Sequence, residues 1–524
     1  MKKKFNITGT CIPERHYMVN IDNKLKAIMA MIGEGDYFTI NRPRQYGKTT
    51  TMFLLEKELE KTEYIDISIS FEGIGDAVFE NEESFSQAFL ELLAEESEND
   101  NEQISNYILN QKSRITDLKK LSRFITNLCL YAKREIVLMI DEVDKSSNNQ
   151  LFLSFIGMLR NKFLRRNAGK DQTFLSVILA GVHDVKNLRL KLHPGEEPKF
   201  NSPWNIAVDF NVDLSFDPQE TATMLRDYSE AENVQMDIED ISGQIYYYTS
   251  GYPFLVSYLC KIFAEEIIPF KKNNKWENTD TEKAVSILLG KQNTNFESLI
   301  GNIENNTDLR EFTRRIIMNG DNISFVFTNP IISTGTVYGV FANDNGRCKI
   351  HNRIYEQLLY DYLMMGTLSE KNVDKASMYN FRENFIDNSG FLYMEKILLK
   401  FQEFMKEQYS NIDNPFLERN GRLIFLAFLK PIINGSGFDF KEVQVSEEKR
   451  LDIVITFYNK KYIVELKIWR GEKYHQKGLD QLCDYLERQN QDKGFLVIFD
   501  SKGKKEWKQE SIDLNEKEIF AIWV

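Results

Sequence analysis

Two neighbouring stretches near the C-terminal end of the chain, Arg450–Ile455 and Tyr462–Lys467, have the alternating pattern of paired β-strands. Apolar residues recur at every second position of the first stretch, and a short turn separates it from the second. Because side chains alternate between the two faces of a strand, Glu465 and Lys467 share a face, and pairing of the strands would bring Asp452 close to both. Two carboxylates beside a lysine can hold a divalent cation, as metal-assisted phosphodiester hydrolysis requires. The alternative interpretation is a pair of amphipathic strands whose charges only face solvent.

The sequence on either side of this hairpin contains further elements in a consistent order. Upstream, the segment around Glu418 opens an apolar helix, and downstream Gly478–Leu486 predicts a helix with Gln481 and Tyr485 on one face. Gly494–Phe499 then supplies another buried strand. In this order the last quarter of the chain resembles the nuclease core of the PD-(D/E)xK superfamily. It is most similar to the nuclease-like domain fused to bacterial AAA-like ATPases.

This resemblance implies a metal-dependent nuclease site. Asp452, Glu465 and Glu418 would bind Mg²⁺, with Mn²⁺ as the alternative ion, because oxygen ligands without Cys or His favour Mg²⁺ over Zn²⁺. Lys467 would position the attacking water and stabilise the charge that develops at phosphorus, and Gln481 would help to hold the substrate or the metal shell. The resemblance further implies a nucleic-acid substrate, with DNA favoured, and by analogy a role in phage defence or mobile-element control.

A second motif lies near the other end of the chain. A strand over Tyr37–Ile40 leads into a loop that ends in Gly-Lys-Thr, and a helix follows. In such a P-loop, backbone amides cradle phosphates, Lys48 neutralises the β- and γ-phosphate charge, and the Thr49 hydroxyl reaches Mg²⁺. Arg42 replaces the first glycine of the motif and Pro43 removes one amide, so a loop that does not bind nucleotide is the alternative. The residues expected to contact ATP are Arg44, Gln45, Tyr46, Gly47, Lys48, Thr49 and Thr50.

The partner of this loop is the apolar run Glu135–Glu142, which ends in two acids and has the pattern of a buried parallel strand. In this Walker B interpretation Asp141 holds the Mg²⁺ shell, and Glu142 orients and deprotonates the attacking water. The structural alternative is a helix N-cap that follows a strand. Because Gly-Lys-Thr lies upstream, the two motifs together predict binding and hydrolysis of ATP.

Other features are less specific. The segment Gly251–Pro253 resembles the Gly-x-Pro lid motif of the ATPase clade near the STAND signalling NTPases, in which the lid helix reports nucleotide state. His183 follows a further buried strand, at a position where related ATPases place a phosphate-sensing residue, but an ordinary surface histidine is the favoured interpretation. Arg160, Arg165 or Arg166 could act as an arginine finger on a neighbouring subunit, or could complement the dipole of their own helix.

With 524 residues the chain is too long for one core, so several domains are expected. The predicted fold class is α/β, with a P-loop AAA-like ATPase core, a helical lid, a winged-helix-like module and a C-terminal α/β PD-(D/E)xK nuclease-like domain. In the module, Ile323–Phe327 and Val337–Ala342 are expected to be short β pieces. The predicted domains are 1–210 for the ATPase core, 211–300 for the lid, 301–375 for the module with its linker, and 380–524 for the nuclease-like domain.

Composition narrows the class further. The net charge of −12 argues against a general basic nucleic-acid binder, although lysines near the Glu-x-Lys strand leave room for a local basic groove. The five scattered cysteines lack CxxC spacing, which fits a reducing cytoplasm and argues against a disulfide framework or a zinc site. No apolar run suggests a signal peptide or approaches the roughly 18 residues of a membrane span, so a cytoplasmic protein without membrane contact is expected.

The sequence therefore predicts an ATP-binding and ATP-hydrolysing protein whose nucleotide state controls a Mg²⁺-dependent nuclease domain. The expected partners are nucleic acid, ATP and, through the ATPase domain, further copies of the chain. One alternative is a nucleotide-driven switch or scaffold whose nuclease-like domain only binds nucleic acid or protein. Another is an active nuclease joined to an ATPase domain that no longer binds nucleotide.

Overall fold

A computed structural model gives the fold of the chain as two compact units. The first unit comprises Met1–Asn302, Val326–Ala342 and His351–Ile354, and the second comprises Ile303–Phe325, Asn343–Ile350 and Tyr355–Val524. The structure describes residues 2–98, 101–143, 149–182, 204, 206–319, 323–370, 385, 391–408, 421, 424–426, 428–429, 440–441, 453–457, 460–469, 471–500 and 507–524.

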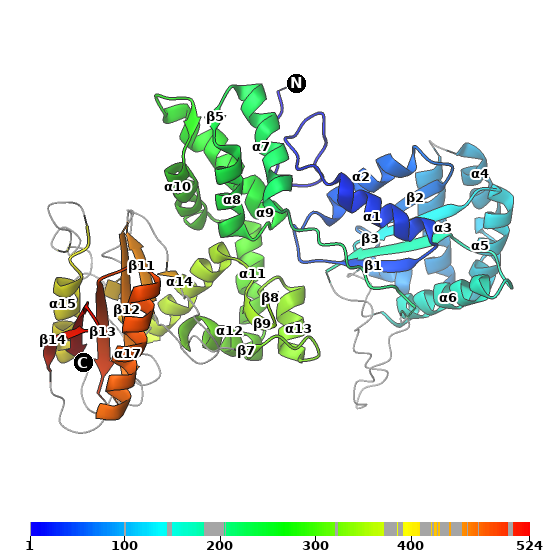
Figure 1. Ribbon diagram of the computed structural model, residues 1–524. Coiled ribbons are helices and arrows are strands. Elements are labelled where there is room, and N and C mark those ends of the chain that lie inside the picture. The colour runs from blue at the N-terminus through cyan, green and yellow to red at the C-terminus, as the bar shows by residue number, and fades with distance from the viewer. Residues whose placement is uncertain are drawn as a thin grey trace. The chain divides into compact units, whose positions relative to one another are not determined.

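The first unit is built on a four-stranded parallel sheet with the strand order β1-β4-β3-β2 (Figure 1). The strands are β1 (Tyr37–Asn41), β2 (Ile65–Ser70), β3 (Ile136–Asp141) and β4 (Ser176–Gly181). β3 and β4 are buried along their whole length, as expected for central strands covered on both faces. Because all four strands are parallel, the loop after β1 and Asp141 at the end of β3 both lie at the carboxyl-terminal ends of the strands.

Helices cover this sheet, and those between Glu82 and Asn167 share a large apolar core with it. The elements are α1 (Asp22–Gly33), α2 (Lys48–Leu59), the 3₁₀ turn η1 (Asp76–Phe79), α3 (Glu82–Ser97), α4 (Glu102–Lys112), α5 (Leu118–Ala132) and α6 (Gln150–Asn167). Each of α3 to α6 begins after an Asn or Asp whose side chain accepts a backbone N–H, which explains why these helices start where they do. Phe85 and Phe89 of α3 pack against Phe155 of α6 in this core.

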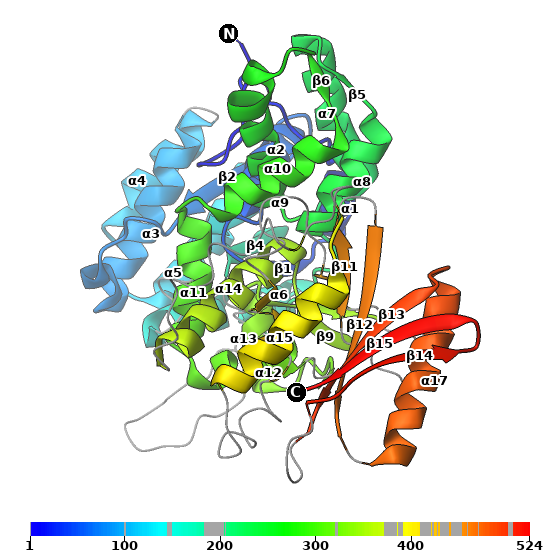
Figure 2. The same cartoon turned by 90° about the vertical axis from the view of Figure 1, so that its left-hand side faces the viewer.

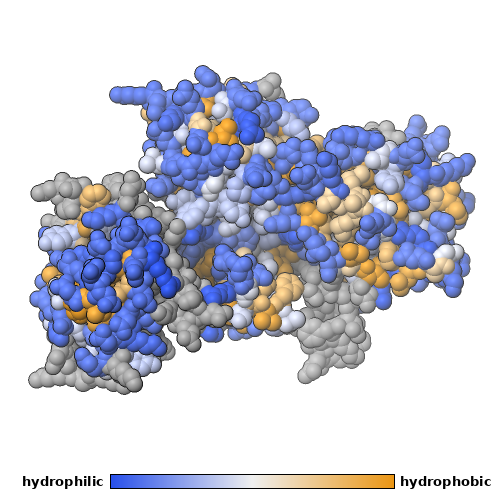
Figure 3. Space-filling model, viewed as in Figure 1, coloured by the Kyte–Doolittle hydropathy of each residue, from blue (hydrophilic) through white to orange (hydrophobic). Residues whose placement is uncertain are grey.

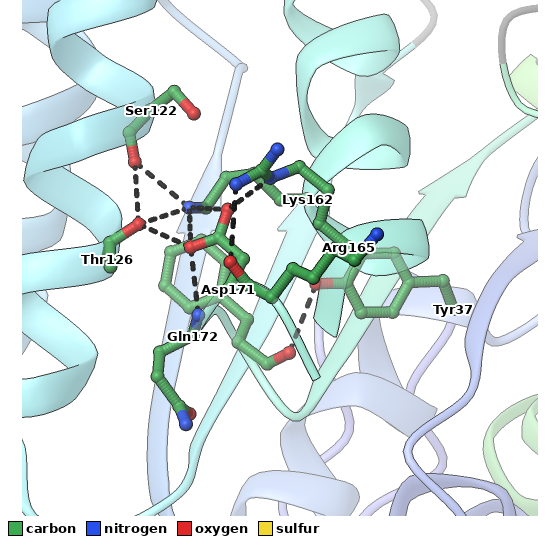
Figure 4. Close-up of polar contacts among 9 residues, drawn as sticks. Tyr37, Ser122, Thr126, Lys162, Arg165, Asp171 and Gln172 are labelled. Atoms are coloured by element: carbon green, nitrogen blue, oxygen red, sulfur yellow. Dashed lines mark hydrogen bonds and ion pairs between the residues drawn. The ribbon is translucent and has the colours of Figure 1, made fainter. Parts of the chain in front are cut away.

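A buried lysine connects α5, α6 and the segment before β4 (Figure 4). The Lys162 amine, with a side chain 1% exposed, donates to Ser122 O at 3.0 Å and Thr126 Oγ1 at 2.7 Å, and lies 3.2 Å from Asp171 Oδ2. Burial lowers the pKa of Lys162. Burial opposes ionisation of Asp171, but the Thr126 hydroxyl and Lys162 outweigh it and hold the pKa of Asp171 below its ordinary value. This network is structural because every donor of Lys162 is directed at a group of its own domain.

After the sheet, the first unit continues as a helical bundle. Its elements are α7 (Pro218–Glu232), β5 (Gln235–Met236), α8 (Ile238–Thr249), α9 (Pro253–Ile262), the π-helical turn η4 (Phe263–Ile267), the 3₁₀ turn η5 (Ile268–Phe270), β6 (Lys275–Trp276), α10 (Asn278–Leu289) and α11 (Thr294–Glu304). α7 begins with a capping box, in which Asp217 accepts from the amide of Glu220 and Glu220 accepts from the amide of Asp217. The Phe263 ring stacks on Trp276 with centroids 3.7 Å apart, which fixes η4 against β6.

The segment expected to be a winged-helix-like module forms α12 (Thr307–Asn319), β7 (Ile323–Ser324), α13 (Pro330–Val337), β8 (Phe341–Asp344), β9 (Arg347–Ile350) and α14 (Arg353–Glu370). The three strands form a sheet with the order β7-β9-β8. The short strand expected over Val337–Ala342 was partly wrong, because Val337 ends a helix and β8 begins at Phe341. Asn329 caps that helix and Pro330 occupies its first turn, and this start signal outweighs the β-branched residues behind it.

The second unit contains a six-stranded sheet with the order β10-β11-β12-β13-β15-β14 (Figure 2). The strands are β10 (Phe440–Lys441), β11 (Ile453–Phe457), β12 (Lys460–Ile468), β13 (Lys493–Phe499), β14 (Gln509–Leu514) and β15 (Lys517–Trp523), and the helices are α15 (Met394–Gln408) and α17 (Glu472–Arg488). β11 and β12 are antiparallel, with Ile453 opposite Val464, so the predicted hairpin is confirmed. β12, β13 and β15 are parallel. The two helices cover opposite faces, since α17 packs with Ile498 whereas Phe401 of α15 contacts Phe499.

The five cysteines are all described and carry free thiols, as their spacing predicted. Burial raises the pKa of Cys129 and of Cys348, in each case to about 12, and also raises the pKa of Cys11. Such thiols are protonated at neutral pH, which excludes them as nucleophiles. Among the described residues, no helix combines the length and the apolar character that crossing a bilayer would need.

Candidate functional site

The first candidate site is the loop between β1 and α2. Gly47 occupies the N-cap of α2 with φ 81°, a left-handed conformation that glycine adopts without strain. Gln45 is also left-handed, with φ 56°. The Lys48 amine turns back over the loop and donates to Arg42 O at 2.9 Å and Pro43 O at 3.0 Å. The loop is therefore a compact turn at a helix N-terminus, the geometry that presents backbone amides to an anion.

Thr49 and Asp141 meet beside this loop. The Thr49 hydroxyl donates to Asp141 Oδ2 at 3.0 Å, and the amide of Glu142 donates to the other carboxylate oxygen at 2.8 Å. Glu142 itself adopts a left-handed φ of 55°. The sequence placed both Thr49 and Asp141 in the Mg²⁺ shell, and the structure brings these two hard-oxygen donors together across 92 residues of sequence.

A cavity of about 170 Å³ lies next to Gly47 and Thr50. Three loop residues, Gln45, Tyr46 and Gly47, and two threonines of α2, Thr50 and Thr51, line the cavity, and apolar side chains form most of its wall. The apolar wall consists of Ile7, Met18, Val19, Ile21, Leu54, Leu214, Phe216, Met224 and Phe254. An apolar hollow beside a phosphate-type loop suits a flat aromatic base attached to a phosphate chain.

The N-terminal segment forms one side of this cavity and is fixed at both ends. Cys11 N donates to Thr50 Oγ1 at 3.1 Å, so the predicted ATP-contacting residue Thr50 holds this segment against α2. Tyr17 OH donates to Glu232 Oε1 at 3.0 Å at the end of α7, and Phe5 packs against the rings of Tyr17 and Tyr228, which also contact each other. No motif in the sequence points to this segment as part of the site. Its only local signal is a short run of residues without helical or strand periodicity.

The Gly-x-Pro segment contacts the loop directly. Gly251 has φ 72°, and a Cβ at this position would lie 2.0 Å from Phe216 O, so only glycine fits. Tyr252 OH donates to Arg44 O at 2.5 Å, and Pro253 Cγ lies 3.8 Å from the place that a Cβ on Gly47 would occupy. The helix that was expected to report nucleotide state thus starts on the loop itself.

The remaining loop residues hold the loop in place. Arg42 donates to Asn41 O at 2.8 Å and Val212 O at 2.7 Å, and its guanidinium lies 5.3 Å from the Phe210 ring centroid. Burial lowers the pKa of Arg42. Tyr46 OH lies 3.3 Å from His351 Nε2, and Gln45 donates to Thr294 Oγ1 at 3.3 Å. Arg42, which replaces the first glycine of the motif, therefore adds a hydrogen bond from the loop to Val212 in the segment after β4.

The candidate for the sensor is His183, and the candidates for the arginine finger are Arg160, Arg165 and Arg166. His183 lies outside the described residues. Arg166 donates to Phe174 O at 2.8 Å and Gly35 O at 2.7 Å, and Arg165 lies 3.6 Å from Asp171 Oδ2. Both side chains therefore stabilise their own domain, and neither contact points to a role on a neighbouring subunit. Arg160 lies in α6 and is half-buried.

The second candidate site lies on β12 and α17. Glu465 is 0% exposed, and its Oε1 lies 2.6 Å from the Lys467 amine. That amine also donates to Gln481 Oε1 at 3.3 Å. The place that a Cβ on Gly478 would occupy lies 3.4 Å from Lys467 Cε, so the helix is in van der Waals contact with the lysine stem. The structure thus brings together Glu465, Lys467 and Gln481, three of the predicted residues.

Two of the predicted metal ligands, Asp452 and Glu418, lie outside the described residues. Asp452 precedes Ile453 in the sequence, and Ile453 is paired with Val464, the neighbour of Glu465. The described residues contain no cluster of three or more His, Cys, Asp or Glu side chains that could hold a metal ion. A complete nuclease metal site would therefore need the residues beyond the described ranges.

Two family models match the chain, one over its N-terminal part and one over its C-terminal part. The sequence model described as an AAA-like domain matches residues 14–360, and that of the PD-(D/E)XK nuclease superfamily matches residues 437–510. None of the curated proteins to which the chain was compared matches it.

Solved structures resemble the chain only in general terms. A Walker-type ATPase of Pyrococcus abyssi is 12% identical over 68% of this chain and 99% of its own, with a TM-score of 0.45. The ORC2 protein of Aeropyrum pernix is 12% identical over 70% and 99%, with a TM-score of 0.38. The RuvB Holliday junction branch migration motor of Thermotoga maritima is 14% identical over 65% and 95%, with a TM-score of 0.31. At scores below 0.5 none of the three supports an inference about this chain.

Proposed function

Because the chain belongs to the AAA-like domain family over residues 14–360, we propose that it binds and hydrolyses ATP and that nucleotide state controls a Mg²⁺-dependent nuclease. The chain joins an ATPase-like domain to a domain of the PD-(D/E)XK nuclease superfamily. The proposal adds catalysis by both domains and a nucleic-acid substrate, with DNA as the favoured substrate. The observation that carries its first half is the contact between Thr49 and Asp141 beside the loop of Lys48.

The nucleotide site follows from the contacts around this loop. The triphosphate would lie against the amides at the head of α2, with Lys48 exchanging the carbonyls of Arg42 and Pro43 for phosphate oxygens. The base would enter the apolar cavity between the N-terminal segment and Phe254. Glu142, next to Asp141, would orient the attacking water. Arg42 does not argue against binding, because its side chain is directed away from the loop to Val212 O.

The donor set at this site fits Mg²⁺. Thr49 and Asp141 offer a hydroxyl and a carboxylate, which are hard oxygen ligands, and their oxygens lie 3.0 Å apart. When bound, the ion would neutralise phosphate charge and orient the chain of phosphates. Asp141 would hold it while the amide of Glu142 keeps the carboxylate in place.

The nuclease site is proposed on Glu465, Lys467 and Gln481, together with Asp452 and Glu418. The Glu465 carboxylate and the two predicted acids form an all-oxygen donor set that fits Mg²⁺. A bound ion would supply a Lewis acid and an activated water. Lys467 would stabilise negative charge at the phosphoryl group, and Gln481 would hold its ammonium in position.

Coupling between the two activities is proposed from the lid and from the path of the chain. Tyr252 and Pro253 touch the loop, so phosphate binding there would act on the start of α9. Tyr46 of the loop also contacts His351 in a segment that is preceded and followed in sequence by parts of the second unit. If these contacts have one arrangement with nucleotide and another without it, ATP would shift the population toward the arrangement that binds it more tightly.

A second candidate function is a nucleotide-driven scaffold whose nuclease-like domain only binds. The observation that favours it is the full burial of Glu465, whose carboxylate forms an ion pair with Lys467. Such a pair would also occur in a domain that has kept the fold without the reaction. The two candidates differ in one measurable property, which is metal-dependent cleavage.

The experiment is a cleavage assay on a panel of single- and double-stranded DNA and RNA with the full chain and Mg²⁺. Lys467→Ala is expected to abolish cleavage, whereas Lys461→Ala, on the same strand with an exposed side chain near Gln489, should leave it unchanged. No cleavage of any substrate by the unmutated protein would favour the scaffold. In parallel, Lys48→Ala should weaken ATP binding by about 10- to 100-fold, since a charged partner of the phosphates is removed.

A further inference from the structure

The first half of α17 carries exposed side chains that continue the line of the proposed nuclease site. Tyr474, Lys477 and Gln481 follow one another at intervals of three and four residues, so they form one stripe on the helix. The last of them contacts the Lys467 amine, and Gly478, one turn after Tyr474, lies against the Lys467 stem. The stripe therefore leads from the Glu-x-Lys pair toward the N-terminus of α17.

The neighbours of α17 show which side of the helix this stripe occupies. Cys483 Sγ contacts Leu514 O, so the opposite flank of the helix is directed toward β14. Gln481 is directed toward β12, and β12 is followed in the sheet by β11, whose first residue Ile453 succeeds Asp452 in sequence. The stripe thus lies on the flank of α17 that is directed toward β12, the strand of Glu465 and Lys467.

The side chains of this stripe differ from the rest of the surface of the second unit. Tyr474 is 60% exposed and is the most exposed large hydrophobic residue among the described residues of that unit. Lys477 is also exposed. The first half of α17 contains one acid, Glu472, and the second half contains three, Asp480, Asp484 and Glu487. Hydrophilic residues predominate on the face that carries α17 (Figure 3), and the exposed Tyr474 ring adds an aromatic surface to this helix.

We propose that this stripe binds a single-stranded segment of the nucleic-acid substrate, with the Tyr474 ring stacked on a base and Lys477 against a phosphate. The inference rests on the proposed nuclease function and adds the substrate class to it. An aromatic side chain can stack only on a base whose face is accessible, and the faces within a duplex are covered by neighbouring pairs. An aromatic ring beside a lysine is a combination that can hold single strands without reading sequence. The acids of the second half of α17 would repel the backbone, so the strand would run over the first half only.

The test measures binding separately from cleavage. Full-length protein carrying Lys467→Ala is titrated, by fluorescence anisotropy, against labelled single-stranded DNA, single-stranded RNA and blunt duplex DNA. Adding Tyr474→Ala should weaken binding of single strands by about 5- to 100-fold and leave duplex binding nearly unchanged. Tyr474→Phe should retain affinity because the ring remains. Lys477→Glu should weaken binding and lower the salt dependence by about one ion.

Tyr393→Ala is the matched control, because this tyrosine is 52% exposed in the same unit and lies outside the stripe. Equal loss with Tyr393→Ala and Tyr474→Ala, or unchanged single-strand binding with Tyr474→Ala, would overturn the inference and leave the proposed function standing. A larger loss for duplex than for single strands would also overturn it. If the protein binds no nucleic acid at all, the proposed function fails and this inference fails with it.

Discussion

The contact between the Gly-x-Pro segment and the nucleotide loop depends on one glycine, and replacing it tests the description of this part of the fold. At Gly251 the backbone is left-handed, with φ 72°, which costs an L-residue about 1–2 kcal/mol. A Cβ there would lie 2.0 Å from Phe216 O and 2.8 Å from Phe216 N, and both atoms belong to backbone that cannot rotate away. Phe216 N also donates to Gly251 O at 2.8 Å, so the strain would disturb a hydrogen bond. Forced displacement of this kind adds about 1–3 kcal/mol.

Gly251→Ala is therefore expected to lower the free energy of unfolding of the first unit by about 2–5 kcal/mol. The matched control is Gly243→Ala in α8, where a Cβ meets no atom within 4 Å and alanine should stabilise the helix by about 0.5–1 kcal/mol. Urea unfolding followed by tryptophan fluorescence compares the two variants, since Trp276 is buried in the same bundle. ATP affinity should also fall in Gly251→Ala, because Tyr252 and Pro253 would move off the loop. A Gly251→Ala protein within about 0.5 kcal/mol of the unmutated chain would refute this reasoning.

Three further predictions follow from individual contacts. Thr49→Ala should reduce Mg²⁺-dependent ATP hydrolysis by about 10- to 100-fold without changing the melting temperature, and an unchanged rate would exclude Thr49 from the metal shell. Arg42→Gly restores the first glycine of the common motif but should not improve ATP affinity. It should destabilise the chain by about 2–4 kcal/mol, because two hydrogen bonds of a charged group are lost. Tighter ATP binding by this variant would contradict this account. Folding lowers the pKa of Asp171, so the contribution of this carboxylate to stability is fully present above the ordinary aspartate pKa and is lost as the pH falls through the lowered value. Asp171→Asn should therefore flatten the pH dependence of the free energy of unfolding between about pH 2 and 5. Identical pH profiles for the variant and the unmutated protein would contradict this assignment.

Features with a local signal in the sequence could be predicted. The β1–loop–α2 arrangement, the buried strand that ends at Asp141, and the hairpin that pairs Ile453 with Val464 are all confirmed. Each depends on a period of two or on an apolar run beside glycine and acid residues, and these patterns are visible within ten residues. The contact of Lys467 with Gln481 also follows, because strand, helix and strand in this order bring the start of the helix to the end of the strand.

Other features depend on contacts between distant segments, which have no periodic signal. The tie from Arg42 to Val212, the hydrogen bond from Tyr252 to Arg44 and the placement of Cys11 against Thr50 are of this kind. The sequence showed Arg42 only as a departure from a motif, and its partner lies 170 residues away. The difference at Val337 is one of boundaries, since this residue is the last of α13 and the strand begins only at Phe341.

The central claim is that the nucleotide bound by the first unit sets the rate at which the second unit cleaves nucleic acid. It is tested most directly by single-turnover cleavage with Mg²⁺ and saturating ATP, a non-hydrolysable ATP analogue, or no nucleotide, in the unmutated protein and in Lys48→Ala. We expect the three rates to differ in the unmutated protein and to become equal in Lys48→Ala. Equal rates under all three conditions, in a protein shown to bind ATP, would contradict the account.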